Sequence, residues 1–202
     1  MKIKKIATNS LVGLLAVLTT GCASYKASNL NALDTEVNAV TQKKDGITVQ
    51  AKTFDKYDCK RYLDRNVIKE GFQPIQLTIK NDSSRRLILS SSNISLPSAA
   101  PNFVAQSVHT STAGRAIGYG VGAYFTFGVL AIPAVVDGIK SSQANKALDI
   151  DFANKALEEK VLLPHSLNNG LIFVPVDQLQ HDFKITFVDA DTNETIEMEV
   201  TC

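Results

Sequence analysis

Short segments in which hydrophobic and polar residues alternate dominate the chain, in one group before residue 97 and a second group after residue 170. Ile47, Val49 and Ala51, for example, alternate with polar residues, which is the period of a half-buried β-strand. Residues that favour turns separate the segments. We therefore predict β-strands over residues 47–53, 75–80, 86–90, 170–176, 182–188 and 196–202.

The residues between these segments predict how the strands connect. Residues 81–84 have turn chemistry, so we expect residues 86–90 to return as the partner of the strand before that turn. Residues 54–71 are charged and predict a short helical or looped connection that ends in glycine. Glu197 and Glu199 alternate with apolar residues in the last segment, a pattern typical of a protected edge strand.

Seven or so short strands with polar turns predict a mainly β fold, an immunoglobulin-like β-sandwich with a helical insert. The insert contains two expected elements, a glycine-rich apolar hairpin and one amphipathic helix. The helix is predicted from apolar residues at helical spacing between Ala144 and Leu157, with Ser141 or Ser142 as its N-cap. The strand pattern is similar to that of small sandwich domains in extracytoplasmic bacterial lipoproteins.

The glycine-rich part of the insert is a stretch of 21 uncharged residues, 116–136, which is long enough to cross a membrane. Gly114, Gly118 and Gly122 recur every four residues and would allow close packing of another backbone. This spacing resembles the glycine zippers of some outer-membrane lipoproteins. If the strands on both sides of the insert pair in one sandwich, its two ends lie on one side of a bilayer. We therefore expect a hairpin that packs on the sandwich, dips into a membrane surface or self-associates.

The N-terminus has the pattern of a secretory signal: three lysines, a short apolar run over residues 11–18, and small residues before Cys22. The sequence from Leu18 to Cys22 resembles the lipobox of bacterial lipoproteins. That resemblance implies cleavage after Gly21, a diacylglyceryl thioether on Cys22 and a further acyl chain such as palmitate on its amine. An ordinary secretory signal and a one-helix inner-membrane anchor are the alternatives.

No aspartate follows Cys22, and within the resemblance this favours the outer membrane of a Gram-negative bacterium, with the membrane face left open. The expected organisation is a signal peptide over residues 1–21, a lipidated N-terminus and polar tether over 22–46, and the sandwich domain over 47–202. The insert within that domain is expected over residues 111–162.

The chain has three cysteines, and lipidation would use Cys22. Cys59 and Cys202 then remain as an even pair in a protein bound for an oxidising compartment, so we expect a disulfide between them. The alternative is two separate reduced thiols.

Charge and motifs exclude several classes of function. The leader holds three of the 21 lysine and arginine residues, which leaves 18 basic against 20 acidic residues and argues against a nucleic-acid partner. His109, His165 and His181 are far apart in the sequence and belong to no metal-binding motif. No nucleophile or phosphate-loop motif is present. We therefore expect no metal, no cofactor and no enzyme activity.

The sequence favours a non-enzymatic lipoprotein of the cell envelope, anchored to membrane lipid through Cys22, that acts as a scaffold or as an accessory module for an unidentified protein partner. The alternative is a membrane-active protein, or one that forms homo-oligomers, through the apolar segment 114–139.

Overall fold

The computed structural model describes residues 24–33, 39–110 and 131–202, and for residues 131–140 it describes the backbone alone. The chain divides into two compact units. Unit 1 comprises Met1–Tyr25 and His109–Ala147, and unit 2 comprises Lys26–Val108 and Leu148–Cys202. Each unit is described by itself.

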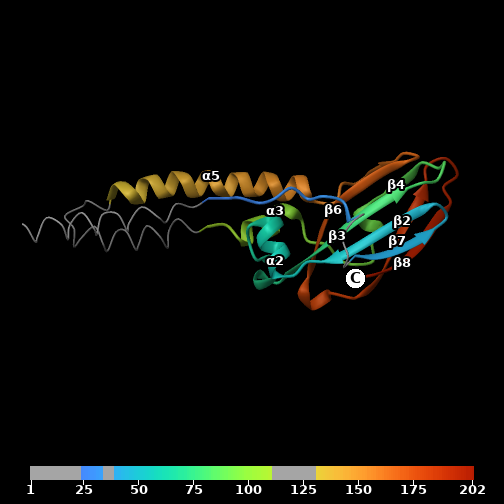
Figure 1. Ribbon diagram of the computed structural model, residues 1–202, viewed down its shortest axis with the longest axis horizontal. Coiled ribbons are helices and arrows are strands. Elements are labelled where there is room, and N and C mark those ends of the chain that lie inside the picture. The colour runs from blue at the N-terminus through green and yellow to red at the C-terminus, as the bar shows by residue number, and fades with distance from the viewer. Residues whose placement is uncertain (1–23, 34–38, 111–130) are drawn as a thin grey trace, which may run out of the picture. The chain divides into compact units, whose positions relative to one another are not determined.

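Unit 2 is a β-sandwich of two four-stranded antiparallel sheets, which confirms the predicted mainly β fold (Figure 1). Sheet A has the order β1 (Val40–Lys44), β2 (Ile47–Thr53), β3 (Phe72–Asn81) and β6 (Ser166–Pro175). Sheet B has the order β5 (Lys160–Leu162), β4 (Leu87–Leu89), β7 (Asp182–Asp189) and β8 (Thr195–Thr201). The chain crosses between the sheets after β3, β5 and β6, the Greek-key type of connection found in immunoglobulin-like sandwiches.

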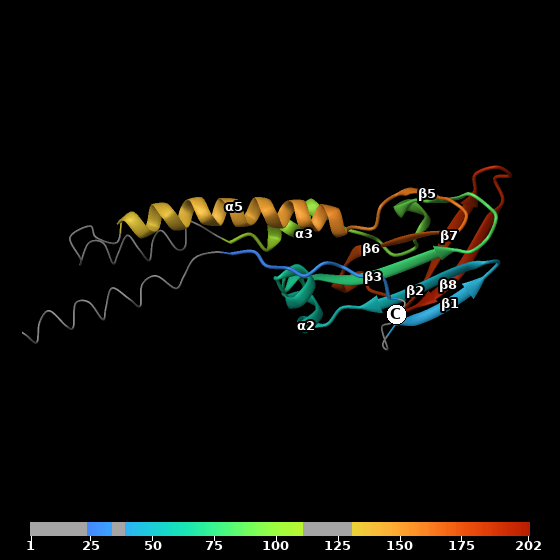
Figure 2. The ribbon, with the colours of Figure 1, turned by 45° about the horizontal axis from the view of Figure 1, so that its top comes forward.

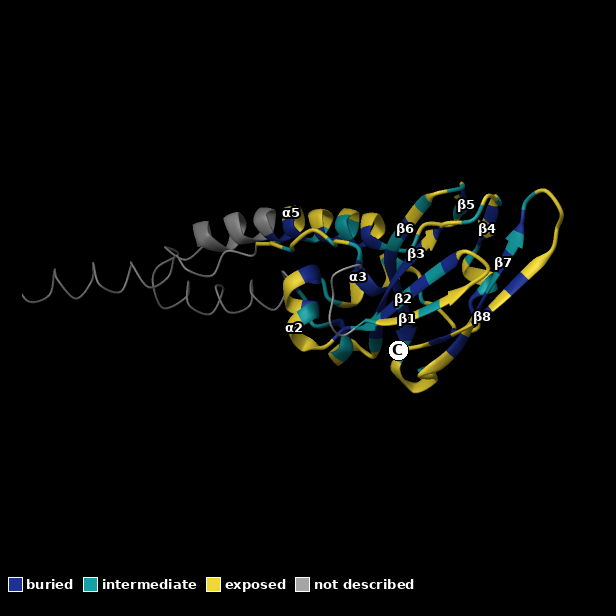
Figure 3. Ribbon diagram, turned by 45° about the vertical axis from the view of Figure 1, so that its right-hand side comes forward, coloured by how far each residue is buried: buried dark blue, intermediate teal, exposed yellow. Residues whose placement is uncertain are grey.

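The core lies between the two sheets and is formed by the alternating apolar residues from which the strands were predicted. Ile75, Leu77 and Ile79 of β3 are fully buried, as are the apolar residues at the predicted positions of β2 and β7. Along β8 buried and exposed residues alternate, and Glu197 and Glu199 are exposed on the edge of sheet B (Figure 3).

The expected hairpin between β3 and β4 is wrong. β4 lies in sheet B, where it pairs with β5 and β7, while β3 pairs with β2 and β6. Leu87 and Leu89 are buried in the core from the opposite sheet. Because the same apolar face would be buried in either sheet, the alternation alone could not distinguish the two arrangements.

Short helices lie together beyond one end of the two sheets (Figures 1 and 2). They are α2 (Lys56–Asp58), η2 (Cys59–Leu63), η3 (Val67–Glu70) and α3 (Pro101–Ser107). A reciprocal capping box of Asp55 and Asp58 begins α2. Gly71 ends η3 with φ +89°, as expected for the predicted connection. Two further single turns, η4 (Ser91–Asn93) and η5 (Val176–Gln178), lie in loops of the sandwich.

The long helix α5 (Ala131–Lys155) begins earlier than predicted. Ser141 and Ser142 therefore lie inside the helix, and neither is its cap; the buried hydroxyl of Ser141 has no hydrogen-bond partner among the described residues. The predicted apolar stripe is present within unit 2, where Leu148 and Phe152 are fully buried. The Phe152 ring stacks on Phe173 of β6 with ring centroids 5.6 Å apart.

The insert is shorter than expected, because β5 lies within residues 111–162 and belongs to sheet B. The predicted apolar hairpin lies partly outside the described residues, and its last part, from Ala131, is helical. Gly114, Gly118 and Gly122 all fall outside the described residues.

The sandwich also begins earlier than residue 47. Within the expected tether, β1 forms a hairpin with β2 through Asp45 and Gly46, whose φ angles are +50° and +78°. An Asp-Gly pair suits a tight turn of this kind, which requires positive φ at both residues.

Candidate functional site

The part of the expected tether that comes before β1 also belongs largely to the sandwich unit. Residues 26–33, here called the strap, pass over sheet A and the neighbouring short helices and are held mainly through their own backbone groups. The side chain of Leu33 is buried, with 1% of its surface exposed. The strap is the feature of the described chain that most directly links the N-terminus to the folded body.

Side chains on the outer face of sheet A bind the strap. Gln76 and Thr78 alternate with the core residues of β3 and so point away from the core, yet only 2% and 1% of their surfaces are exposed. Gln76 Nε2 donates to the carbonyl of Asn31 at 2.6 Å, and Thr78 Oγ1 accepts from the amide of Leu33 at 3.0 Å. The strap thus satisfies polar groups that it covers.

Asn169 of β6 joins these contacts into one network. Its Oδ1 accepts from Gln76 Nε2 at 2.9 Å and from Thr78 Oγ1 at 2.7 Å. Its Nδ2 donates to the carbonyl of Leu30 at 3.2 Å. Side-chain amides both donate and accept, so this face can bond both the N–H and the C=O groups of the strap backbone.

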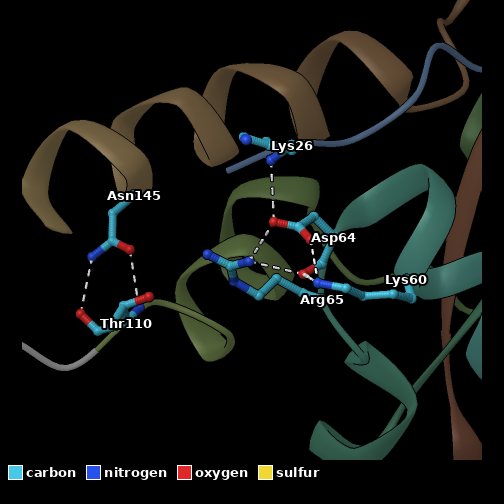
Figure 4. Close-up of polar contacts among 6 residues, drawn as sticks. All are labelled: Lys26, Lys60, Asp64, Arg65, Thr110 and Asn145. Atoms are coloured by element: carbon cyan, nitrogen blue, oxygen red, sulfur yellow. Dashed lines mark hydrogen bonds and ion pairs between the residues drawn. The ribbon is translucent and has the colours of Figure 1, made fainter. Parts of the chain in front are cut away.

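The first residue of the strap is held by a charged cluster in the short helices (Figure 4). The backbone N–H of Lys26 donates to Asp64 Oδ2 at 3.1 Å, and Arg65 Nη1 donates to the same oxygen at 2.8 Å. Lys60 forms an ion pair with the other carboxylate oxygen. Two residues further along the strap, the amide of Ser28 donates to the carbonyl of Arg61 at 2.8 Å.

The electrostatics of Asp64 follow from these contacts. Burial by itself raises the pKa of the carboxyl group, but the hydrogen bonds from Lys60 and Lys26 and the charges of Lys60 and Arg65 outweigh it and hold the pKa below its usual value. Asp64 also has φ +51°, a left-handed conformation that Asp and Asn tolerate better than most residues. It is therefore ionised at neutral pH and anchors the start of the strap.

A second charged contact fixes the end of α5 to the short helices within unit 2. Lys155 is only 7% exposed, and its Nζ donates to the carbonyl of Tyr62 at 2.6 Å and to Asp151 Oδ2 at 2.5 Å. Within unit 1, Asn145 of α5 exchanges two hydrogen bonds with the backbone of Thr110, at 3.0 and 3.3 Å (Figure 4).

The expected disulfide is not formed in the structure, where Cys59 and Cys202 are both free thiols. Cys59 is fully buried in η2, and burial, followed by the charges of Asp58 and Asp55, raises the pKa of its thiol to about 12. Cys202 follows β8, and burial raises the pKa of its thiol as well. A reactive cysteine needs its thiolate, so the high pKa of both thiols disfavours a nucleophilic role. An even number of cysteines does not determine pairing, which depends on which elements carry them.

Some predicted site residues lie outside the described part of the chain, and within it His165 and His181 make no contact with the strap that the structure shows. Gly21 and Cys22 are outside the described residues. His181 Nδ1 lies 3.0 Å from the carbonyl oxygen of Cys202, and His165 sits in a turn with φ +57°. Over residues 24–33, 39–110 and 131–202, no three histidine, cysteine, aspartate or glutamate residues are grouped as metal ligands would be. In the same part of the chain, no helix combines the length and hydrophobicity that a membrane crossing requires.

A cavity of about 310 Å³ opens beside the seam of the two sheets in unit 2. Its lining is largely apolar and includes Leu89, Ile94, Leu157 and Phe173. Its titratable lining residues are Glu158 and Glu159. Glu159 accepts a hydrogen bond from the amide of Ser91 at 3.0 Å, and the hydrogen bonds from Ser91 lower the pKa of its carboxyl group. The hydroxyl of Ser91 donates to the same carboxylate oxygen, and the lowered pKa makes Glu159 a weak base toward it.

Comparisons of the chain with protein-family models, with curated proteins and with solved structures find no match.

The sequence did not single out the residues that hold the strap. Gln76, Thr78, Asn169 and Gln50, whose Nε2 donates to the carbonyl of Leu33 at 3.4 Å, occupy positions where an alternating strand ordinarily faces water. The sequence offered one signal for these residues, the number of amide side chains at outward strand positions. Those positions are seen to be neighbours only once the pairing of β3 with β6 is known.

Proposed function

We propose that this protein is a lipid-anchored, non-enzymatic lipoprotein of the cell envelope that acts by contact, as a scaffold or as an accessory module for another protein. The leader and Cys22 support the anchor, and the absence of recognisable catalytic motifs in the sequence supports a contact function. We place it in the outer membrane of a Gram-negative bacterium, because no aspartate follows Cys22.

The strap is the observation that carries this proposal. A tether that merely spaces a domain from its anchor needs no contacts with that domain. Here residues 26–33 are bound to sheet A by side chains of β3 and β6. They are bound to the short helices by the side chain of Asp64 and the backbone carbonyl of Arg61. An anchor attached at Cys22 would therefore hold the sandwich in a limited range of orientations, which suits a protein that presents one surface to a partner in or near the membrane.

Membrane fractionation tests the anchor. Residues 1–21 are replaced by an ordinary secretory leader and Cys22 by alanine, so that the chain is exported and cut without acylation. We expect the native protein in the membrane fraction and the Cys22→Ala protein in the aqueous fraction. Retention of the Cys22→Ala protein in membranes would favour the alternative function, in which the uncharged residues 116–136 engage lipid or form homo-oligomers.

Crosslinking tests the contact function. Native protein crosslinked in intact cells and isolated under denaturing conditions should carry the same partner protein in repeated experiments. The matched control is the secreted Cys22→Ala protein, which should lose that partner if the anchor positions the sandwich. Isolation of the native protein without any reproducible partner would contradict the proposal.

A further inference from the structure

We infer that the short helices at one end of unit 2 form a surface that contacts a lipid bilayer. This surface, here called the helical end, comprises α2, η2, η3 and α3. Its exposed aromatic side chains enter the interfacial layer of the membrane and its basic side chains meet anionic headgroups. The inference rests on the proposed acylation of Cys22 and adds to it the orientation of the sandwich.

Only a short length of chain separates the proposed lipid from the helical end. Lys26 is fixed to Asp64, which directly follows η2, and Ser28 is fixed to Arg61 within η2. Lys26 is the fourth residue after Cys22. A fully extended chain advances at most about 3.6 Å per residue, so these four residues reach about 14 Å at most. An acylated Cys22 at the membrane surface therefore keeps the helical end close to the bilayer.

Two large aromatic side chains are exposed on the helical end. Tyr57 of α2 is 70% exposed, and Phe103 of α3 is 61% exposed although its ring edge meets Phe72 with centroids 5.9 Å apart. Aromatic side chains are enriched at the interface between membrane and water, where part of the ring leaves water. Burial in that layer would remove apolar surface that the described residues of unit 2 leave open.

The helical end also carries an excess of exposed positive charge. Between Asp55 and Glu70 the exposed basic residues outnumber the exposed acidic ones, because two of the four aspartate and glutamate residues there, Asp58 and Asp64, are withdrawn from the surface into ion pairs. The exposed basic residues are Lys56, Arg61, Lys69 and Lys60, the last of which pairs with Asp64 while 71% of its side chain stays exposed. Basic residues held near an anionic membrane are attracted to its headgroups.

The opposite end of the sandwich provides a matched control. Strand β3 starts next to the helical end at Phe72 and ends at Asn81, so it spans about 30 Å at the usual rise of a strand. The side chain of Asn81 donates to the carbonyl of Leu163 at 3.1 Å, which places Leu163 at the far end. Leu163 is 56% exposed, similar to Phe103, but lies at the end of β3 opposite to the helical end and so too far from it to meet the same membrane surface.

Tryptophan fluorescence tests the inference sharply, because the chain contains no tryptophan. Three variants of the full acylated protein, Tyr57→Trp, Phe103→Trp and Leu163→Trp, each introduce one fluorophore at an exposed position. They are reconstituted into vesicles of phosphatidylglycerol and phosphatidylcholine with and without brominated acyl chains, which quench tryptophan at short range. We expect emission from the first two variants to fall by about half or more, as for tryptophan at headgroup level, and emission from Leu163→Trp to stay unchanged.

Two checks separate this inference from the proposal on which it rests. The mass of the N-terminal peptide shows whether Cys22 is acylated, and vesicle flotation shows whether the protein is bound. If Cys22 is acylated and the protein floats, absence of quenching at positions 57 and 103, or equal quenching at position 163, overturns the inference alone. Ten glycine and serine residues inserted between Ser24 and Tyr25 should reduce quenching at positions 57 and 103, and unchanged quenching would show that the short reach does not set the orientation.

Discussion

Replacing Asn169 by alanine should release the strap from sheet A. The side chain of Asn169 accepts hydrogen bonds from Gln76 and Thr78 and donates one to the carbonyl of Leu30. Gln76 keeps its bond to Asn31 in the variant, whereas its second Nε2 hydrogen, the hydroxyl hydrogen of Thr78 and the carbonyl of Leu30 lose their partners. A buried polar group left without a partner costs about 1–3 kcal/mol, and the Leu30 carbonyl can turn to water once the strap loosens. We therefore expect the free energy of unfolding to fall by about 2–4 kcal/mol.

The assay has two parts, because a loss of stability alone would not show where the change acts. Urea unfolding followed by circular dichroism gives the change in stability. Hydrogen exchange gives its location: in Asn169→Ala the amide of Leu33, which donates to Thr78 Oγ1, should exchange much faster while the amides of the paired strands β7 and β8 change little.

Thr48→Ala is the matched control, since Thr48 is a half-buried residue of β2 in the same sheet. Its effect should stay below about 1 kcal/mol, the range of strand propensity, with no change in the exchange of Leu33. The reasoning is refuted if Asn169→Ala leaves the exchange of the strap amides at the native rate, or if Thr48→Ala accelerates it equally.

Three further predictions concern other contacts of unit 2. Because the pKa of Asp64 lies below its usual value, its carboxylate stabilises the fold at neutral pH and loses that effect as pH falls through the folded pKa. The stability of Asp64→Asn should therefore differ most from that of the native protein near pH 7 and progressively less below about pH 4. A difference in stability that is independent of pH would contradict this. Gly170→Ala should lower the melting temperature and the free energy of unfolding, the latter by about 1–3 kcal/mol, because the added Cβ would lie 2.5 Å from the Cα of Leu157. An unchanged melting temperature would show that residues 156–157 move away freely. Lys155→Met should lower the free energy of unfolding in urea by about 1–3 kcal/mol, since it leaves the buried carbonyl of Tyr62 without its donor. A gain in stability would mean that burying the ammonium group costs more free energy than its hydrogen bonds and ion pair contribute.

The strands show how far the sequence alone determines the fold. β2 has the bounds that the alternation of Ile47, Val49 and Ala51 predicted, and β7 extends one residue beyond its prediction. A period of two identifies strands because only one face of each strand enters the core. The sheet to which β4 belongs was predicted wrongly, since both sheets of a sandwich bury an apolar face and local pattern does not distinguish them.

The strap shows why the candidate site was less predictable than the fold. The amide of Leu33 meets Thr78, which is 45 residues away in sequence, and neither residue shows in its local pattern that the other covers it. Residues 26–33 are polar and lack a strong period, so the sequence indicated a free tether. The contacts depend on backbone groups of the strap, and backbone groups carry no signal in the sequence.

The central claim is that a lipid attached to Cys22 anchors a sandwich to which the following residues are firmly bound. Mass spectrometry of the N-terminal peptide of native protein tests it most directly. We expect a peptide that begins at Cys22 and carries a thioether-linked diacylglyceryl group, with a further acyl chain on the amine. An unmodified Cys22 thiol, or a chain that still begins at Met1, would contradict it.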